Sequence, residues 1–138
     1  MTPHQATAVE IGGRALLIEG PPGSGKSSLA LALIDRGARL IGDDGVMLEV
    51  SGRQLLTHPH PETRGLLEVR GLGLLRFEHC ESAPVALLLA LDHEAPRFVE
   101  AAERAERLGI TLPLLSLWPD SPVLVIRAEL ALEHFGLA

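Results

Sequence analysis

The chain has 138 residues, of which 46% are hydrophobic and 22% charged, so we expect a single globular domain (residues 1–138) with a buried core. A formal net charge of −6 and an aromatic content of 3% argue against a nucleic-acid partner, because such binding depends on cationic contacts with phosphate. No signal peptide and no membrane-spanning apolar run is present, and the one cysteine cannot form an internal disulfide. We therefore expect a cytoplasmic protein that makes no membrane contact.

The N-terminal segment predicts a β-hairpin. Residues 7–11 alternate weakly between apolar and polar, and the Gly12-Gly13 pair that follows is typical of a tight turn. A strand is then predicted over residues 14–19, around the apolar run 15–18. The sequence thus predicts that this second strand has an antiparallel neighbour.

Residues 20–27, GPPGSGKS, fit the phosphate-binding motif G-x-x-x-x-G-K-[ST] (Walker A) between that strand and a helical pattern. The glycines let backbone amides approach a polyphosphate, Lys26 can reach its outer oxygens, and the Ser27 hydroxyl can bind Mg²⁺. An ordinary strand-to-helix turn needs only one glycine and no Lys-Ser pair. The predicted nucleotide-binding residues are Gly20, Pro21, Pro22, Gly23, Ser24, Gly25, Lys26, Ser27 and Ser28.

Two carboxylates follow the next predicted strand. A helix is predicted over residues 26–36 with Gly37 at its C-terminal end, then a short strand over residues 38–41, and then Asp43-Asp44. Such a pair at a strand end suits Mg²⁺ coordination and proton abstraction, although Asp-Asp-Gly also occurs in solvated turns. Neighbours on an extended chain point apart, so we assign Asp43 to the metal and Asp44 to the base, with a bend at Gly45.

The middle of the chain predicts short strands and loops. Strands are expected at residues 46–50 and 54–57, joined by a hairpin turn, and a loop at residues 58–62, where two prolines alternate with two histidines. We interpret these histidines as surface residues and not as zinc ligands. In the extended segment 65–75, Glu68 and Arg70 share one face. This face either looks into the site or carries an exposed ion pair on an edge strand.

The C-terminal third begins with the continuous apolar run 84–91, which predicts a central strand covered on both faces. Residues 96–109 are helical by propensity, with Pro96 at the first helical position and Gly109 beyond the end. Residues 112–117, interrupted by Pro113, predict an edge strand. A last helix is expected from an N-cap at Ser121, with Pro122 as its first residue, to about Phe135.

Three blocks together resemble the catalytic domain of bacterial HPr kinase/phosphorylase: GPPGSGKSSLALALIDRGARLIGDD, LEVRGLG, and more loosely an N-terminal histidine, His4. The resemblance implies a P-loop α/β fold of the HPr kinase and phosphoenolpyruvate carboxykinase type, a mixed sheet with flanking helices. It implies use of ATP and Mg²⁺ and transfer of phosphate to a serine of the phosphocarrier protein HPr. By the same resemblance Arg70 and His4 belong to the catalytic set, and Glu68 joins Ser27 and Asp43 as a metal ligand.

The departures from that family are specific. Ser28 stands where the family has an acidic residue, and the chain has no room for the family's N-terminal domain and little for its C-terminal loop and helices. It is similar instead to the short proteobacterial form, in which residues 97–109 are loop and strand. Phosphate removal from HPr and assembly into a homo-oligomer stay open. A non-catalytic ATP-sensing module and a small-molecule kinase on the same scaffold are the alternatives.

Overall fold

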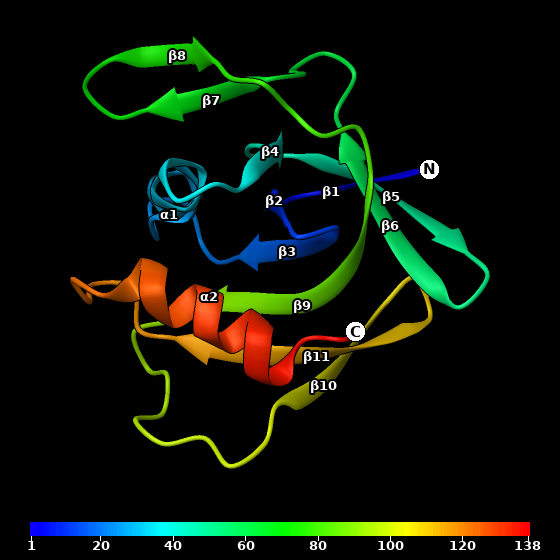
Figure 1. The fold of residues 1–138 in the computed structure, drawn as a ribbon, viewed down its shortest axis with the longest axis vertical. Coiled ribbons are helices and arrows are strands. Elements are labelled where there is room, and N and C mark those ends of the chain that lie inside the picture. Colours follow the sequence, from blue (N-terminus) through cyan, green and yellow to red (C-terminus); the bar gives the residue numbers. More distant parts are fainter.

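Two aliphatic strands, β3 (Arg14–Glu19) and β9 (Ala83–Leu91), run parallel at the centre of a mixed sheet (Figure 1). The computed structural model describes residues 1–138. The other elements are β1 (Thr2–His4), β2 (Thr7–Ile11), α1 (Lys26–Asp35), β4 (Arg39–Gly42), β5 (Val46–Ser51), β6 (Gln54–Pro59), β7 (Leu66–Val69), β8 (Gly73–Arg76), β10 (Glu103–Arg107), β11 (Ile110–Leu117) and α2 (Leu124–Phe135). The strand order is β1-β5-β6-β9-β3-β2-β4. Off this path, β11 pairs with β9 and β10 pairs with β11, while β7 and β8 form a separate hairpin.

The alternation of side chains along β3 divides the core into two layers. Leu16 and Ile18 face the layer that both helices cover, whereas Ala15 and Leu17 face the layer closed by β5 and β6. All four side chains are fully buried, and each large aliphatic one contributes about 2 kcal/mol to stability. The two faces therefore fix the register of the strand that leads into the glycine loop, residues 20–27.

Several local predictions are confirmed. Gly12 and Gly13 have φ of 59° and 88° and form the tight turn between antiparallel β2 and β3. The α1 helix ends where expected, with Gly37 at φ 109° and the Ala38 amide donating to the Leu33 carbonyl at 3.0 Å. The run at residues 84–91 lies in β9, between β3 and other strands of the sheet. As a separate finding, neither α1 nor α2 has the length and the apolar character that crossing a bilayer requires.

The helix predicted over residues 96–109 is wrong. Residues 103–107 form β10, which pairs antiparallel with β11, as the family resemblance implies. Gly109, with φ 83°, belongs to the turn between these strands instead of ending a helix. The strand pairing satisfies the backbone groups of this segment, and this tertiary gain overrides the helical propensity of its Ala, Glu and Arg residues.

Two boundaries and the place of one strand in the sheet also differ from expectation. His58 and Pro59 belong to β6, so the proline-rich loop begins only at His60; Pro59 is tolerated as the last residue of the strand. The α2 helix begins at Leu124, because the Ser121 hydroxyl accepts a bond from the Val123 amide in a preceding turn and caps no helix. The strand containing Pro113 is not an edge, since β11 pairs with both β10 and β9. The pairing with β9 starts only at Leu114.

Candidate active site

The glycine loop joins β3 to α1 and is shaped by glycines where no other residue fits. Gly23 and Gly25 have φ of 79° and 102°. A Cβ on Gly20 would lie 2.7 Å from the Ser24 hydroxyl oxygen and 3.2 Å from the Leu91 carbonyl oxygen. The Lys26 ammonium donates across the loop to the carbonyls of Gly20 at 2.8 Å and Pro21 at 3.2 Å. The loop thus presents amides and one ammonium around a hollow at the N-terminus of α1, which suits an anion.

A polar pocket of about 240 Å³ opens above this loop, and no hydrophobic side chain lines it. The structure brings together residues from the loop, the carboxylate pair and the 65–75 segment, which are far apart in sequence. The lining residues are Thr7, Pro22, Gly23, Gly25, Lys26, Ser27, Ser28, Asp44, Glu68 and Arg70. Of the predicted nucleotide-binding residues, Gly20, Pro21 and Ser24 form the loop but do not line the pocket.

Asp43 is buried and bonded through both carboxylate oxygens. Its Oδ1 accepts from the Ser27 hydroxyl at 2.6 Å and from the Thr7 hydroxyl at 3.1 Å, and its Oδ2 accepts from the Glu68 amide at 3.0 Å. The carboxylate therefore joins β2, α1 and β7 at one point. It also places two hard oxygens, those of Ser27 and Asp43, side by side as Mg²⁺ requires.

Asp44 turns back toward the pocket because its own backbone is left-handed, with φ 53°. The bend predicted at Gly45 thus begins one residue earlier. The segment before β2 holds the turn: the Gly45 amide donates to the Ala6 carbonyl at 2.9 Å, and the Gln5 amide group donates to Asp44 Oδ1 at 3.3 Å. Asp44 borders both the polar pocket and an outer cavity of about 400 Å³, which His4 also lines.

Thr7 is a site residue that sequence reasoning missed. Its side chain is fully buried, and its hydroxyl donates to Asp43 and accepts from the Asp44 amide at 3.3 Å. Nothing in the weakly alternating 7–11 segment distinguishes this threonine from a strand residue of the core. Only the pairing of β2 with β4 brings it beside the carboxylates.

The β7–β8 hairpin carries Glu68 and Arg70 over the pocket. Leu67 and Val69 are buried in the core layer that also contains residues of α1 and α2. The predicted alternation, with Leu67 and Val69 on one face and Glu68 and Arg70 on the other, is therefore confirmed. No ion pair joins Glu68 to Arg70, and the Arg70 guanidinium has no hydrogen-bond partner. The arginine is therefore free to bind an anion in the pocket.

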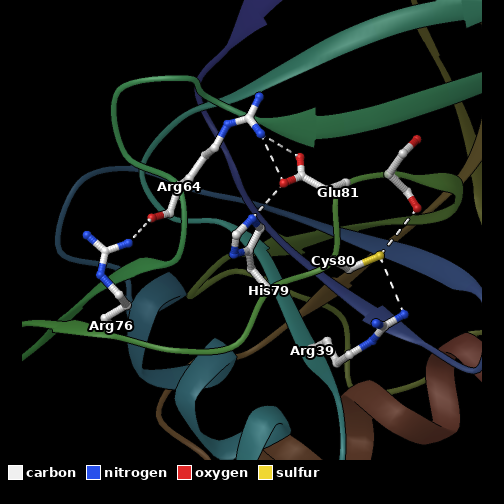
Figure 2. Close-up of polar contacts among 7 residues, drawn as sticks. Arg39, Arg64, Arg76, His79, Cys80 and Glu81 are labelled. Carbon is white, nitrogen blue, oxygen red and sulfur yellow. Dashed lines mark hydrogen bonds and ion pairs between the residues drawn. The ribbon is translucent and has the colours of Figure 1, made fainter.

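Polar contacts at the base of the hairpin join the segments before and after it, and one more, from Arg39 of β4 to Cys80 Sγ at 3.7 Å, reaches the sheet (Figure 2). The Arg64 guanidinium donates to the Glu81 carboxylate at 3.0 Å, and the same carboxylate is 2.8 Å from the His79 ring. Arg76 donates to the Arg64 carbonyl at 3.1 Å, which ties the two ends of the hairpin together. These contacts between Arg64, Arg76, His79 and Glu81 are exposed, so each contributes little to stability.

Glu19, the last residue of β3, links the loop to two distant strands. Its carboxylate lies 2.6 Å from the His4 ring and forms two bonds with the Arg107 guanidinium, at 2.6 and 3.0 Å. Burial by itself would raise the pKa of Glu19, but the bonds from His4 and Arg107 outweigh it and lower the pKa to about 2. His4 is therefore held beside the site at the outer cavity and does not line the polar pocket.

Comparison with known families decides the relationship. Residues 1–81 match the model of the HPr Serine kinase C-terminal domain. The chain belongs to this family. It is a kinase family, and the matched region contains the glycine loop, the carboxylate pair and the whole β7–β8 hairpin.

Individual relatives agree with this assignment. The HPr kinase/phosphorylase of Chloroherpeton thalassium is 29% identical over 152 aligned positions, which cover 96% of this chain and 45% of the relative. The HPr kinase/phosphorylase of Mycoplasma genitalium is 39% identical over 118 positions, which cover 79% of this chain and 36% of the relative. The HPr kinase/phosphorylase of an Exiguobacterium species is 45% identical over 76 positions, which cover 54% of this chain and 24% of the relative. The chain thus spans less than half the length of each of these relatives.

A solved structure shares the fold over almost the whole chain. The structure described as the Hpr(Ser) kinase/phosphatase from Coxiella burnetii superposes with a TM-score of 0.86 at 24% identity. The match covers 96% of this chain and 95% of that one, so β10, β11 and α2 lie within the shared fold although the family model ends at residue 81.

Proposed function

We propose that the chain is an ATP-dependent protein kinase that transfers phosphate to a serine of the phosphocarrier protein HPr. The observation that carries the proposal is the position of Asp44, whose carboxylate borders the polar pocket on one side and the outer cavity on the other. A phosphate donor in the first and an acceptor hydroxyl at the second would meet at this side chain.

Each residue then has a separate task. The amides of the glycine loop and Lys26 hold the outer phosphates of ATP, while Ser27 and Asp43, with Glu68 at the rim, are the oxygen ligands available to Mg²⁺. Mg²⁺, when bound, neutralises part of the phosphate charge. Asp44 accepts the proton of the serine hydroxyl, and Arg70 binds an oxygen of the transferred group. His4 is assigned a tuning role near the acceptor.

Of the two activities, phosphorylation of HPr and removal of phosphate from it, we assign only phosphorylation to this chain. Ser28 lines the pocket at the position where the sequence resemblance implies an acidic residue in the family, so this chain offers a hydroxyl there and no carboxylate. We therefore assign transfer to HPr and make no assignment of phosphate removal.

The test is transfer of labelled γ-phosphate from Mg·ATP to HPr from the same organism. We expect labelled phosphoserine on HPr, and a loss of about 100-fold or more in the Asp44→Asn variant, because the hydroxyl loses its base while the nucleotide site is unchanged. Asp43→Asn should instead raise the Mg²⁺ concentration needed for half-maximal rate. Tight ATP binding with no transfer by the wild type would indicate a sensor, and transfer to metabolites alone would indicate a small-molecule kinase.

A further inference from the structure

The polar pocket has no place for the base of a nucleotide. It measures about 240 Å³ and contains no hydrophobic side chain, whereas a purine is bound mainly by apolar and aromatic surface. A nucleotide whose phosphates lie in the glycine loop must therefore place its nucleoside outside this pocket.

The cavity with a suitable lining lies at the ends of β9 and β11. It has a volume of about 900 Å³, and its walls are the segment after β9, the end of β11 and one flank of α2. We call it the β9–β11 groove. Half of its sixteen lining residues are hydrophobic, among them Trp118 and Phe135. The remainder include Arg97 and Arg127 and no carboxylate, so the lining suits an aromatic ring attached to an anion.

Direct contacts connect the groove to the glycine loop. The Leu91 carbonyl at the end of β9 is 3.2 Å from the position of a Gly20 Cβ, so the end of β9 touches the start of the loop. The next residue, Asp92, donates its amide to the Leu117 carbonyl at 3.0 Å, and Trp118 follows. Since β3, β9 and β11 are parallel, their carboxyl ends share one edge of the sheet, where open α/β sheets bind ligands (Figure 1).

The direction of the phosphate chain favours this side of the loop. Asp43 and Asp44 follow β4, which lies on one side of β3, while β9 and β11 lie on the other. If the terminal phosphate faces Asp44, the nucleoside end leaves the loop toward β9 and β11. Trp118 is available there, because the residue is 45% exposed and the His93 ring meets the indole edge-on, with centroids 6.4 Å apart, so the contact covers only part of the indole.

We propose that the β9–β11 groove binds the purine and ribose of the nucleotide, with the base against Trp118 and His93 and the cation of Arg97 near the inner phosphate. The proposal rests on the proposed use of ATP by the same site. It assigns a function to the C-terminal third of the chain, which lies beyond the residues matched by the family model.

Trp118 is the only tryptophan, so its fluorescence reports on this groove alone. The chain is titrated in parallel with Mg·ATP and with Mg·tripolyphosphate, which has the same three phosphates and no nucleoside, and affinities are measured by calorimetry. We expect ATP to alter the Trp118 emission and to bind roughly tenfold tighter or more, because stacking of one base on an aromatic side chain has an effect of that size. Tripolyphosphate should bind without altering the emission.

Variants separate the groove from the phosphate site. Trp118→Leu should lower ATP affinity toward that of tripolyphosphate and leave tripolyphosphate affinity unchanged. Phe98→Leu is the matched control, since Phe98 is 80% exposed and does not line the groove. If Trp118→Leu fails to fold, His93→Ala, at an exposed position, should produce the same selective loss.

Other outcomes overturn the inference in distinguishable ways. Equal affinity for ATP and tripolyphosphate, with no change at Trp118, would place the nucleoside elsewhere while leaving the phosphate site and the proposed kinase intact. If neither ATP nor tripolyphosphate binds, both the proposed kinase function and the proposed nucleoside site are refuted. A Trp118→Leu variant that changes oligomeric state but not ATP affinity would assign the groove to a second copy of the chain.

Discussion

At the scale of single residues, the hydroxyl of Thr7 contacts both aspartates of the site. It donates to Asp43 Oδ1 and accepts from the Asp44 amide, while the Ser27 hydroxyl bonds the same oxygen of Asp43. Adjacent aspartates on an extended strand would point to opposite sides, and the left-handed backbone of Asp44 is uncommon for a residue with a side chain. Thr7 thus stabilises a conformation that the Asp-Asp-Gly sequence would not favour by itself.

Replacing Thr7 by Val keeps the shape of the side chain and removes its hydroxyl. We expect transfer to HPr to fall about tenfold or more, the Mg²⁺ requirement to rise, and stability to drop by about 1–2 kcal/mol, because Asp43 loses a donor and the Asp44 amide an acceptor. Thr7→Ser should restore most of the activity. The matched control is Thr57→Val: this threonine is also fully buried, but its hydroxyl has no partner, so stability should be unchanged or higher. Normal kinetics in Thr7→Val would refute the positioning role.

At the scale of secondary-structure elements, the β7–β8 hairpin is the part of the site with least support. It forms its own two-stranded sheet, and β8 is exposed along its whole length. It is held by the buried side chains of Leu67 and Val69, by the bond from the Glu68 amide to Asp43, and by the cluster in Figure 2. A displacement of Asp43 would therefore also displace the hairpin, because the Glu68 amide is hydrogen-bonded to the Asp43 carboxylate.

Arg70→Ala tests whether the hairpin supplies a ligand to the pocket. We expect a loss of roughly 10- to 100-fold in kcat/KM, which corresponds to one lost charge-assisted hydrogen bond, and an unchanged Tm, because Arg70 has no partner in the folded chain. Arg53→Ala is the control: this exposed arginine lies in the turn between β5 and β6, outside the pocket, and its loss should alter neither turnover nor Tm. A lower Tm with unchanged turnover at Arg70 would mean that its role is structural.

At the scale of the whole molecule, Glu19 connects the N-terminal strand, the strand before the glycine loop and β10, which are distant in sequence. The pKa of Glu19 is lowered to about 2 from an ordinary 4.5, so the unfolded chain takes up this proton at a higher pH than the folded one. The stabilisation is thus fully present above pH 4.5 and is lost as pH falls toward the folded pKa.

Urea unfolding at several pH values tests this link. Wild type should lose on the order of 2 kcal/mol, attributable to Glu19, as pH falls from about 5 to about 2.5, and Glu19→Gln should lack that part of the loss while being less stable at neutral pH. Glu81→Gln is the control, because the pKa of Glu81 is also lowered but its ion pairs are exposed and worth little. Parallel pH profiles for wild type and Glu19→Gln would contradict the assignment.

Features that need only a few neighbouring residues could be predicted from the sequence. The glycine loop, the Gly12-Gly13 turn and the end of α1 at Gly37 depend on backbone conformations that glycine alone adopts easily. The alternation in β7 and the apolar runs of β3 and β9 likewise indicated which side chains are buried. These local features could therefore be predicted before their arrangement in space was known.

The arrangement was decided by tertiary contacts. Residues 103–107 have helical propensity but form β10, because β11 offers backbone partners that local sequence does not reveal. Thr7 became a site residue only through the pairing of β2 with β4, and the β9–β11 groove exists only because parallel pairing brings two strand ends together. Local sequence determines which structures each segment can form. Pairing between distant segments then selects one of them, because the energy of that pairing depends on residues far apart in the sequence.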